Sequence, residues 1–163
     1  MKYKSILFLC TGNCCRSPMA EGILKHLLKN LDIIVHSAGT YAIEDFPPSE
    51  TSVAIMKENG IDISQHKARS LTEKMLKETD LVLAMASEHV DYIREFYPKY
   101  FDKVYLLKKF GIENGYVEDE AVHDPIGGDE SVYRECYSIL KNELIRITSI
   151  LFDEAVRDDD TEQ

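Results

Sequence analysis

The chain has 163 residues, 44% of them apolar, which is enough for one compact domain and argues against global disorder. Its formal net charge of −10 disfavours nucleic acid and anionic membranes as partners. The apolar run that ends at Cys10 is too short for a signal peptide or a spanning helix. We therefore expect a cytoplasmic protein, a monomer or weak dimer, with no nucleic-acid or membrane partner.

Strand-like and helix-like patterns alternate along the chain. The strands are expected at 3–9, 33–37, 80–85 and 103–107, and the helices at 18–29, 49–60, 87–96 and 130–152, with Ser49 and Ser87 as caps. This order predicts an α/β fold, a four-stranded parallel sheet flanked by helices on both faces. We expect one domain over residues 1–153 and an acidic flexible tail over 154–163.

The loop after the first expected strand contains three of the four cysteines. It reads Cys10-Thr11-Gly12-Asn13-Cys14-Cys15-Arg16-Ser17 and precedes Pro18, which suits the first turn of a helix. Backbone N–H groups at a strand-to-helix turn can form an anion cradle, and Gly12 and Asn13 tolerate the left-handed backbone that a tight cradle needs. Cysteines clustered in this way indicate thiol chemistry rather than a disulfide framework or a structural zinc site.

Cys10 and Arg16, with five residues between them, predict a nucleophile and a phosphate clamp. The helix dipole, the loop amides and Arg16 are expected to lower the pKa of the Cys10 thiol, so that its thiolate can attack phosphorus. Ser17 can donate to the sulfur when it becomes a leaving group. A bare Cys-x5-Arg pattern is weak, since a cysteine at a strand end is commonly a core residue, but the loop context favours function. The amides and Arg16 neutralise the transferred group, so no metal or cofactor is expected.

Asp124 is the candidate general acid. It lies in the segment His123-Asp124-Pro125-Ile126-Gly127-Gly128, within a stretch of little periodicity. Proline favours extended backbone at Asp124, and the glycines allow the loop to fold over a site. Alone, the segment would be an ordinary Asp-Pro turn. Because phosphoryl transfer needs a proton for the leaving group, Cys10 and Arg16 make the catalytic interpretation the better one.

The run from Leu9 to Glu21, together with Asp124-Pro125, resembles the signature of the low-molecular-weight protein-tyrosine phosphatases. The segments 37–40, 60–62, 66–69 and 80–85 are similar to that family too. The resemblance implies hydrolysis of a phosphorylated protein substrate through phosphocysteine, without a metal. It makes Cys10 the nucleophile, Arg16 the phosphate binder, Ser17 the thiolate donor and Asp124 the general acid.

The resemblance also implies roles for the residues around these four. Asn13 would hold the loop through side-chain bonds involving Ser17 and His66, and Cys15 would form a reversible disulfide with Cys10 under oxidation. Tyr41 and Phe46 are candidates for the pocket wall, or else anchors of their loop. The residues expected to contact phosphate are Thr11, Gly12, Asn13, Cys14 and Cys15.

Two positions depart from the tyrosine-specific pattern. Cys14 stands where a bulky aliphatic residue is common, and Ile126 and Gly127 stand where many members carry two aromatic residues. Both departures are similar to the bacterial protein-arginine phosphatase branch, which has a small threonine in the loop and a Gly-Gly after the Asp-Pro. Phosphotyrosine and phosphoarginine are therefore both candidate substrates.

Two other functions compete with a phosphatase. A thiol-dependent arsenate reductase would need resolving cysteines near the third strand, where the segment 84–87 has none, and Cys136 is expected to pack in the core. A non-catalytic phosphate-binding module would keep the cradle but would not need Cys10 paired with Asp124.

Overall fold

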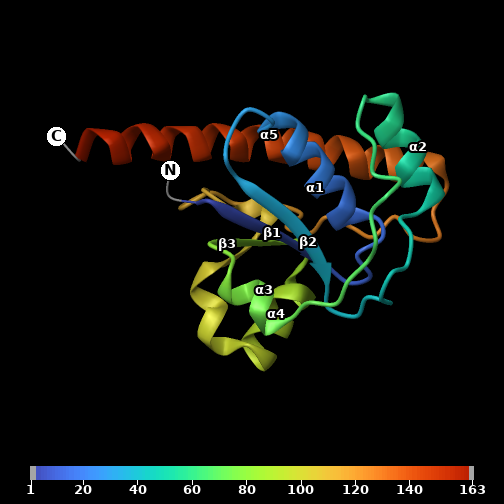
Figure 1. Ribbon diagram of the computed structural model, residues 1–163, viewed down its shortest axis with the longest axis horizontal. Helices are drawn as coiled ribbons and strands as arrows, with labels where there is room; N and C mark the ends of the chain where they lie inside the picture. The colour runs from blue at the N-terminus through green and yellow to red at the C-terminus, as the bar shows by residue number, and fades with distance from the viewer. Residues whose placement is uncertain (1–2, 162–163) are drawn as a thin grey trace.

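The computed structural model describes residues 3–161, with the side chains of 153–161 outside the description. Its sheet has the order β2-β1-β3-β4, and every neighbouring pair is parallel (Figure 1). The strands are β1 (Ser5–Cys10), β2 (Ile34–Gly39), β3 (Leu81–Ala84) and β4 (Val104–Leu106). Because the strand order reverses between β1 and β3, a crevice is expected at their carboxyl ends. The predicted fold class is confirmed.

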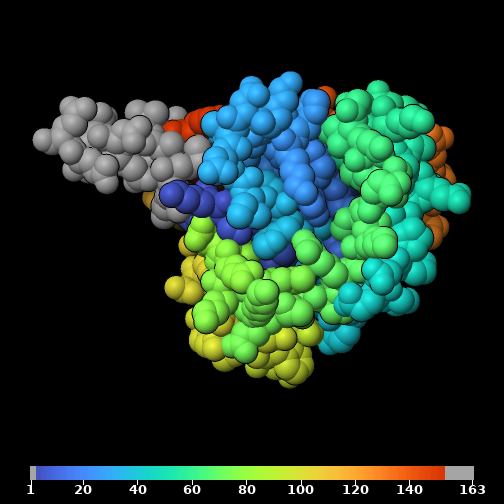
Figure 2. All heavy atoms as spheres, in the orientation of Figure 1, coloured from blue at the N-terminus to red at the C-terminus, as the bar shows by residue number. Residues whose placement is uncertain are grey.

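Helices cover both faces of the sheet, as Figure 1 shows, and little of β1 is visible in the space-filling view (Figure 2). On one face lie α1 (Arg16–Leu27), α2 (Glu50–Glu58) and α5 (Glu130–Thr161), and on the other lie α3 (Glu73–Lys77) and α4 (Ser87–Phe96). Every residue of β1 is buried, as expected for a parallel strand covered twice. Among the described residues, no helix is both long and apolar enough to cross a membrane.

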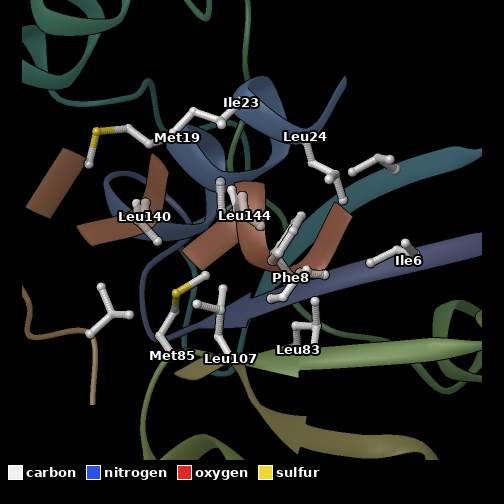
Figure 3. Close-up of a cluster of buried hydrophobic side chains, with 14 of the residues drawn as sticks. Ile6, Phe8, Met19, Ile23, Leu24, Leu83, Met85, Leu107, Leu140 and Leu144 are labelled. Carbon is white, nitrogen blue, oxygen red and sulfur yellow. The ribbon is translucent and has the colours of Figure 1, made fainter. Parts of the chain in front are cut away.

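Two apolar clusters hold these layers together. The larger one joins the sheet to α1 and α5, and its buried side chains include Phe8, Leu24, Leu140 and Leu144 (Figure 3). The smaller one joins the opposite face to α3 and α4. Alternate residues of β1 point into alternate clusters, so the strand that leads to Cys10 is fixed from both sides.

The element bounds differ from the predicted ones in a few places. α1 begins at Arg16 rather than near Pro18, and Ala86, not Ser87, precedes α4 as its cap residue. Ser49 does cap α2, since its Oγ accepts a hydrogen bond from the Ser52 N–H at 3.2 Å. The five-residue α3 and the 3₁₀ turns Pro98–Lys103 and Leu107–Lys109 were not predicted, because periodicity does not reveal elements this short.

The closing helix is longer than the sequence predicts. Its expected end is near Phe152, but α5 continues to Thr161. The tail predicted over 154–163 therefore has helical backbone as far as the structure describes it, and its side chains and residues 162–163 lie outside the description. Its flexibility stays a prediction.

Candidate active site

The loop between β1 and α1 lies at the carboxyl edge of the sheet, next to the point where the strand order reverses. Asn13 has the left-handed backbone anticipated there, with φ 53°, whereas Gly12 is not in that region. Gly39, at the end of β2, passes so close that an added Cβ would lie 2.4 Å from the Thr11 carbonyl oxygen and 3.1 Å from the Asn13 nitrogen. The shape of the loop thus depends on a left-handed residue within it and on a glycine across from it.

Cys10 is 2% exposed at the base of this loop. Its Sγ lies 2.8 Å from Ser17 Oγ and accepts a hydrogen bond from the Asn13 N–H at 3.3 Å. Burial raises the pKa of the Cys10 thiol, while the Ser17 hydrogen bonds, the Arg16 charge and the Asn13 N–H lower it. The expectation of a lowered pKa is therefore wrong for this state, because burial outweighs the groups that favour the thiolate.

Asn13 is completely buried and links the loop to three other segments. Its Nδ2 donates to Ser17 Oγ at 2.8 Å and to Ser37 Oγ at 2.9 Å, and its Oδ1 accepts from the Arg69 N–H at 3.0 Å. His66 Nε2 lies 2.9 Å from the Asn13 backbone oxygen. The predicted association of Asn13, Ser17 and His66 is present, except that His66 bonds the main chain of Asn13 rather than its side chain.

Arg16 joins the loop to the segment that carries Asp124. Its buried guanidinium donates from Nη1 to the Val122 carbonyl at 3.0 Å. Nη2 lies 3.3 Å from Asp124 Oδ2 and 3.5 Å from Thr11 Oγ1. The Asp124 side chain is 42% exposed, against 4% for Arg16, and its Oδ1 accepts from the Ile126 N–H at 3.1 Å. A buried cation and a half-exposed carboxylate thus share the rim of the loop.

One small cavity brings most of the predicted residues together. Its lining residues are Cys10, Gly12, Asn13, Cys14, Cys15, Arg16, Asp124 and Ile126. Thr11 and Ser17 are not among them, although both bond to residues that are. Tyr41 and Phe46, proposed for the wall, are also not among them: the Tyr41 ring is 70% exposed and packs edge-on against Tyr92, and Phe46 is 48% exposed.

The side chains of the two adjacent cysteines of the loop are in contact. Cys14 Sγ and Cys15 Sγ lie 3.8 Å apart, and Cys15 Sγ lies 3.9 Å from the Tyr133 hydroxyl. Hydrogen bonding with Cys14 lowers the pKa of Cys15, and the same contact raises the pKa of Cys14. All four cysteines are free thiols, and Cys136 is buried in the core as expected.

Sequence reasoning missed several residues of the site, among them His89, Val122 and Gly39. His89 Nε2 lies 2.8 Å from Thr11 Oγ1. His89 could have been found from the sequence, because it lies in the first turn of the helix after β3 and therefore near the carboxyl edge of the sheet. Val122 contributes only a carbonyl, for which side-chain identity gives no sign. Gly39 lies in the segment 37–40 that carried the resemblance, but its steric role needs the fold. Within the described part of the chain, no three His, Cys, Asp or Glu side chains are arranged to hold a metal ion.

Comparisons with known proteins agree with this geometry. Residues 5–159 match the model of the low molecular weight phosphotyrosine protein phosphatase family. A protein-arginine-phosphatase of Bacillus subtilis is 37% identical over 143 residues, which are 86% of this chain and 91% of that protein. The low molecular weight protein tyrosine phosphatase of T. tengcongensis is 42% identical, with TM-score 0.81 over 89% of this chain and 97% of that one.

A further solved structure bears on the loop itself. It is a YwlE arginine phosphatase in which serine replaces cysteine and the active-site serine is phosphorylated. It is 33% identical to this chain, with TM-score 0.83 over 90% of this chain and 95% of that one. The sequence, the fold and the loop agree, and the chain belongs to the low molecular weight phosphotyrosine protein phosphatase family.

Proposed function

We propose that this protein is a metal-independent protein phosphatase that hydrolyses phosphotyrosine or phosphoarginine through a phosphocysteine on Cys10. The observation that carries the proposal is the cavity where Cys10, Arg16 and Asp124 meet, although Asp124 is over a hundred residues from the loop in sequence. A core cysteine or a simple anion reader would not need the carboxylate there. The relatives named for both substrates support the class of reaction.

In the first step, the loop amides and Arg16 bind the phosphoryl oxygens, Cys10 releases its proton to solvent, and Asp124 takes one up from solvent. The Cys10 thiolate then attacks phosphorus, so that a P–S bond forms while the bond to the leaving oxygen or nitrogen breaks. Asp124 gives the leaving group its proton. Arg16 contacts Asp124 in the structure, so the acid is already beside the site where the phosphoryl group would bind.

In the second step, Asp124 acts as a base on a water molecule. The water attacks the phosphocysteine, the P–S bond breaks, and inorganic phosphate leaves. Ser17, whose Oγ lies 2.8 Å from the sulfur, donates to the departing thiolate. The YwlE variant, in which the serine that replaces a cysteine of the active site is phosphorylated, supports a covalent phosphoryl intermediate on Cys10.

The first experiment replaces the nucleophile. In the Cys10→Ser variant, turnover should fall by a factor on the order of 10⁴ or more, while inorganic phosphate still binds. Cys136→Ala is the control, because it removes a buried thiol that does not line the cavity and should keep turnover per folded molecule. Full activity of Cys10→Ser would exclude the phosphocysteine mechanism.

Substrate choice is proposed to depend on Cys14 and Ile126, the two cavity residues that depart from the tyrosine-specific pattern. A small Cys14 leaves room beside the phosphate, and Ile126 offers no aromatic face for a phenyl ring. The test compares matched phosphotyrosine and phosphoarginine peptides with the unmodified chain and with Cys14→Ile. The larger side chain should shift the preference toward phosphotyrosine, and a ratio that does not move would refute a role for Cys14.

The loop thiols are also proposed to protect the nucleophile, with Cys15 forming a disulfide with Cys10 after oxidation. Their shared cavity supports this, and Cys14, 3.8 Å from Cys15, would compete for the same bond. Mass spectrometry after mild peroxide should find the Cys10–Cys15 bridge, and overoxidised Cys10 without a bridge would count against protection. Such chemistry suits the cytoplasm, where we propose that the protein acts as a monomer or weak dimer.

A further inference from the structure

His89 is a buried histidine that bonds two neighbouring strand ends at once. It is 1% exposed in the first turn of α4. Its Nδ1 accepts a hydrogen bond from the Ala86 N–H at 3.1 Å, just after β3. Its Nε2 lies 2.8 Å from Thr11 Oγ1, just after β1. The imidazole therefore joins the ends of β1 and β3, at the point where the strand order reverses.

The Ala86 bond determines where the proton of the imidazole lies. Nδ1 can accept from a backbone N–H only when it carries no hydrogen, so the neutral ring has its proton on Nε2. Nε2 then donates to Thr11 Oγ1. Protonation of Nδ1 would place its N–H against the N–H of Ala86, so that two donors would face each other. In keeping with this, burial and the charge of Arg16 lower the pKa of His89 to about 4, opposed by the more weakly acting Glu88 and Asp124.

Thr11 connects His89 to Arg16, the residue proposed to bind phosphate. Its Oγ1 also lies 3.5 Å from Arg16 Nη2, while the other terminal nitrogen of Arg16 donates to the Val122 carbonyl. With both His89 and Arg16 directed at its oxygen, the Thr11 hydroxyl has little freedom to turn. Arg16 in turn is held on two sides, at Thr11 and at Val122.

We propose that His89 is a positioning residue for phosphate binding, which it serves by donating from Nε2 to Thr11 and so orienting Thr11 and Arg16. This inference rests on the proposed function of the loop. The two ring nitrogens then have separate tasks: Nδ1 caps α4, and Nε2 orders the site. A histidine kept only for the stability of α4 would need Nδ1 alone.

Two conservative variants separate the tasks. His89→Asn puts an oxygen near the place of Nδ1 and has no atom that reaches Thr11, so it keeps the cap and loses the donor. His89→Gln reaches toward Thr11 with its amide nitrogen and lacks the acceptor for Ala86. We expect His89→Asn to bind inorganic phosphate about tenfold more weakly at a nearly unchanged melting temperature. His89→Gln should retain most of the phosphate affinity and melt at a lower temperature.

A double-mutant cycle tests whether the effect passes through Thr11. Thr11→Val keeps the shape of the side chain and removes Oγ1, so His89→Asn should cost no further phosphate affinity in that background. Losses that add independently would overturn the inference. So would a His89→Asn variant that binds phosphate as tightly as the unmodified chain, since His89 would then be only a helix cap.

Phosphate titration without substrate keeps this inference separate from the proposed function. If the unmodified chain binds phosphate, loses affinity in His89→Asn and hydrolyses neither peptide, the proposed function fails and the positioning role stands. If it hydrolyses peptides and His89→Asn changes neither phosphate affinity nor KM, the positioning role fails alone. If the Gln variant does not recover affinity at a temperature where it is folded, donation from Nε2 is excluded.

Discussion

The loop that would bind phosphate and the segment that carries the acid differ in almost every physical respect. In the loop, Cys10, Asn13 and Ser17 are at most 2% exposed, and each is bonded to another of the three. The segment 110–128 contains no helix or strand, and Asp124 is 42% exposed. The loop thus consists of buried side chains that hydrogen-bond to one another. The segment 110–128 consists mostly of exposed residues that contact the rest of the protein at a few points.

The difference matches two demands of the chemistry. Charge developing on a phosphoryl group is stabilised best by donors that are already oriented. A proton donor that must later accept a proton from water has to remain accessible to solvent. Arg16 connects the regions, because it originates in the first and bonds Val122 and Asp124 in the second. The following predictions test whether the two regions can be changed separately.

Asp124→Asn should have the largest effect, because it removes proton transfer and leaves the cradle intact. We expect kcat for a poor leaving group to fall by about 10²–10⁴-fold. An activated leaving group such as p-nitrophenolate should be affected less, and inorganic phosphate should bind at least as well because Arg16 is no longer paired with a carboxylate. The measurements are kcat for the two leaving groups and a phosphate titration.

Asp129→Asn is the matched control for Asp124→Asn. It makes the same change five residues away, at a residue whose side chain accepts from the Ser131 N–H before α5, and asparagine caps a helix as well as aspartate does. Its activity should stay close to that of the unmodified chain. Equal losses for good and poor leaving groups in Asp124→Asn would show that Asp124 shapes the cradle rather than transfers a proton.

Gly39→Ala changes the phosphate-binding loop between β1 and α1 instead. The added methyl would lie 2.4 Å from the Thr11 oxygen, so the loop has to shift. A displacement on the order of 1 Å can cost about 10²-fold in rate, and we expect a loss of that size in kcat/KM together with weaker phosphate binding. Gly60→Ala is the control, because at φ 75° with open space around it the change strains the backbone away from the site. Similar activity losses in both variants would point to general destabilisation.

The sequence predicts the cradle much better than it predicts what supports it. Cys10, Arg16 and Ser17 could be identified because their types and spacing match one chemistry, and the regular pattern of strands and helices placed them at a strand-to-helix turn. Asp124 followed from the need for an acid. In contrast, Val122 acts through its backbone and Gly39 through a missing methyl, and neither leaves a local pattern.

Aromatic type alone was a poor guide to the pocket wall. Tyr41 follows β2 closely enough for its N–H to bond the Thr11 carbonyl at 3.0 Å, yet its ring packs against Tyr92 away from the cavity lining. The cavity is lined instead by Ile126, which the sequence presented only as a departure from a family pattern. Side-chain direction in an irregular segment depends on tertiary packing, so it could not be read in advance.

Ser17→Ala should have a smaller effect, confined to the cradle. Its hydrogen bonds lower the pKa of Cys10, so their loss should raise that pKa further and reduce the thiolate fraction at pH 7. Iodoacetamide should then alkylate Cys10 several-fold more slowly at pH 7, with the midpoint of the rate profile at higher pH. An unchanged profile would mean that Arg16 and the amides suffice to stabilise the thiolate. Mass spectrometry of the modified peptide separates Cys10 from Cys14 and Cys15.

Lys108→Met should have the smallest effect, confined to the segment 110–128 that carries Asp124. The nearly buried Lys108 Nζ donates to the Asp119 carbonyl at 3.0 Å and lies 3.5 Å from Asp119 Oδ2, while the neighbouring Lys109 makes an exposed ion pair with Glu120. Losing the first bond should cost about 1 kcal/mol of stability, whereas Lys109→Met should cost less because exposed pairs contribute little.

The kinetic result of Lys108→Met shows how far the two regions are independent. Hydrogen exchange should rise in the segment 110–122, and kcat should fall a few-fold because Asp124 is less well placed. Phosphate affinity should barely change if the cradle is ordered by its own bonds to Asn13 and Ser17. If the affinity for phosphate falls as much as kcat, then the loss of order in the segment 110–128 reaches Arg16 through its bond to Val122. The phosphate-binding loop would then depend on that segment for part of its rigidity.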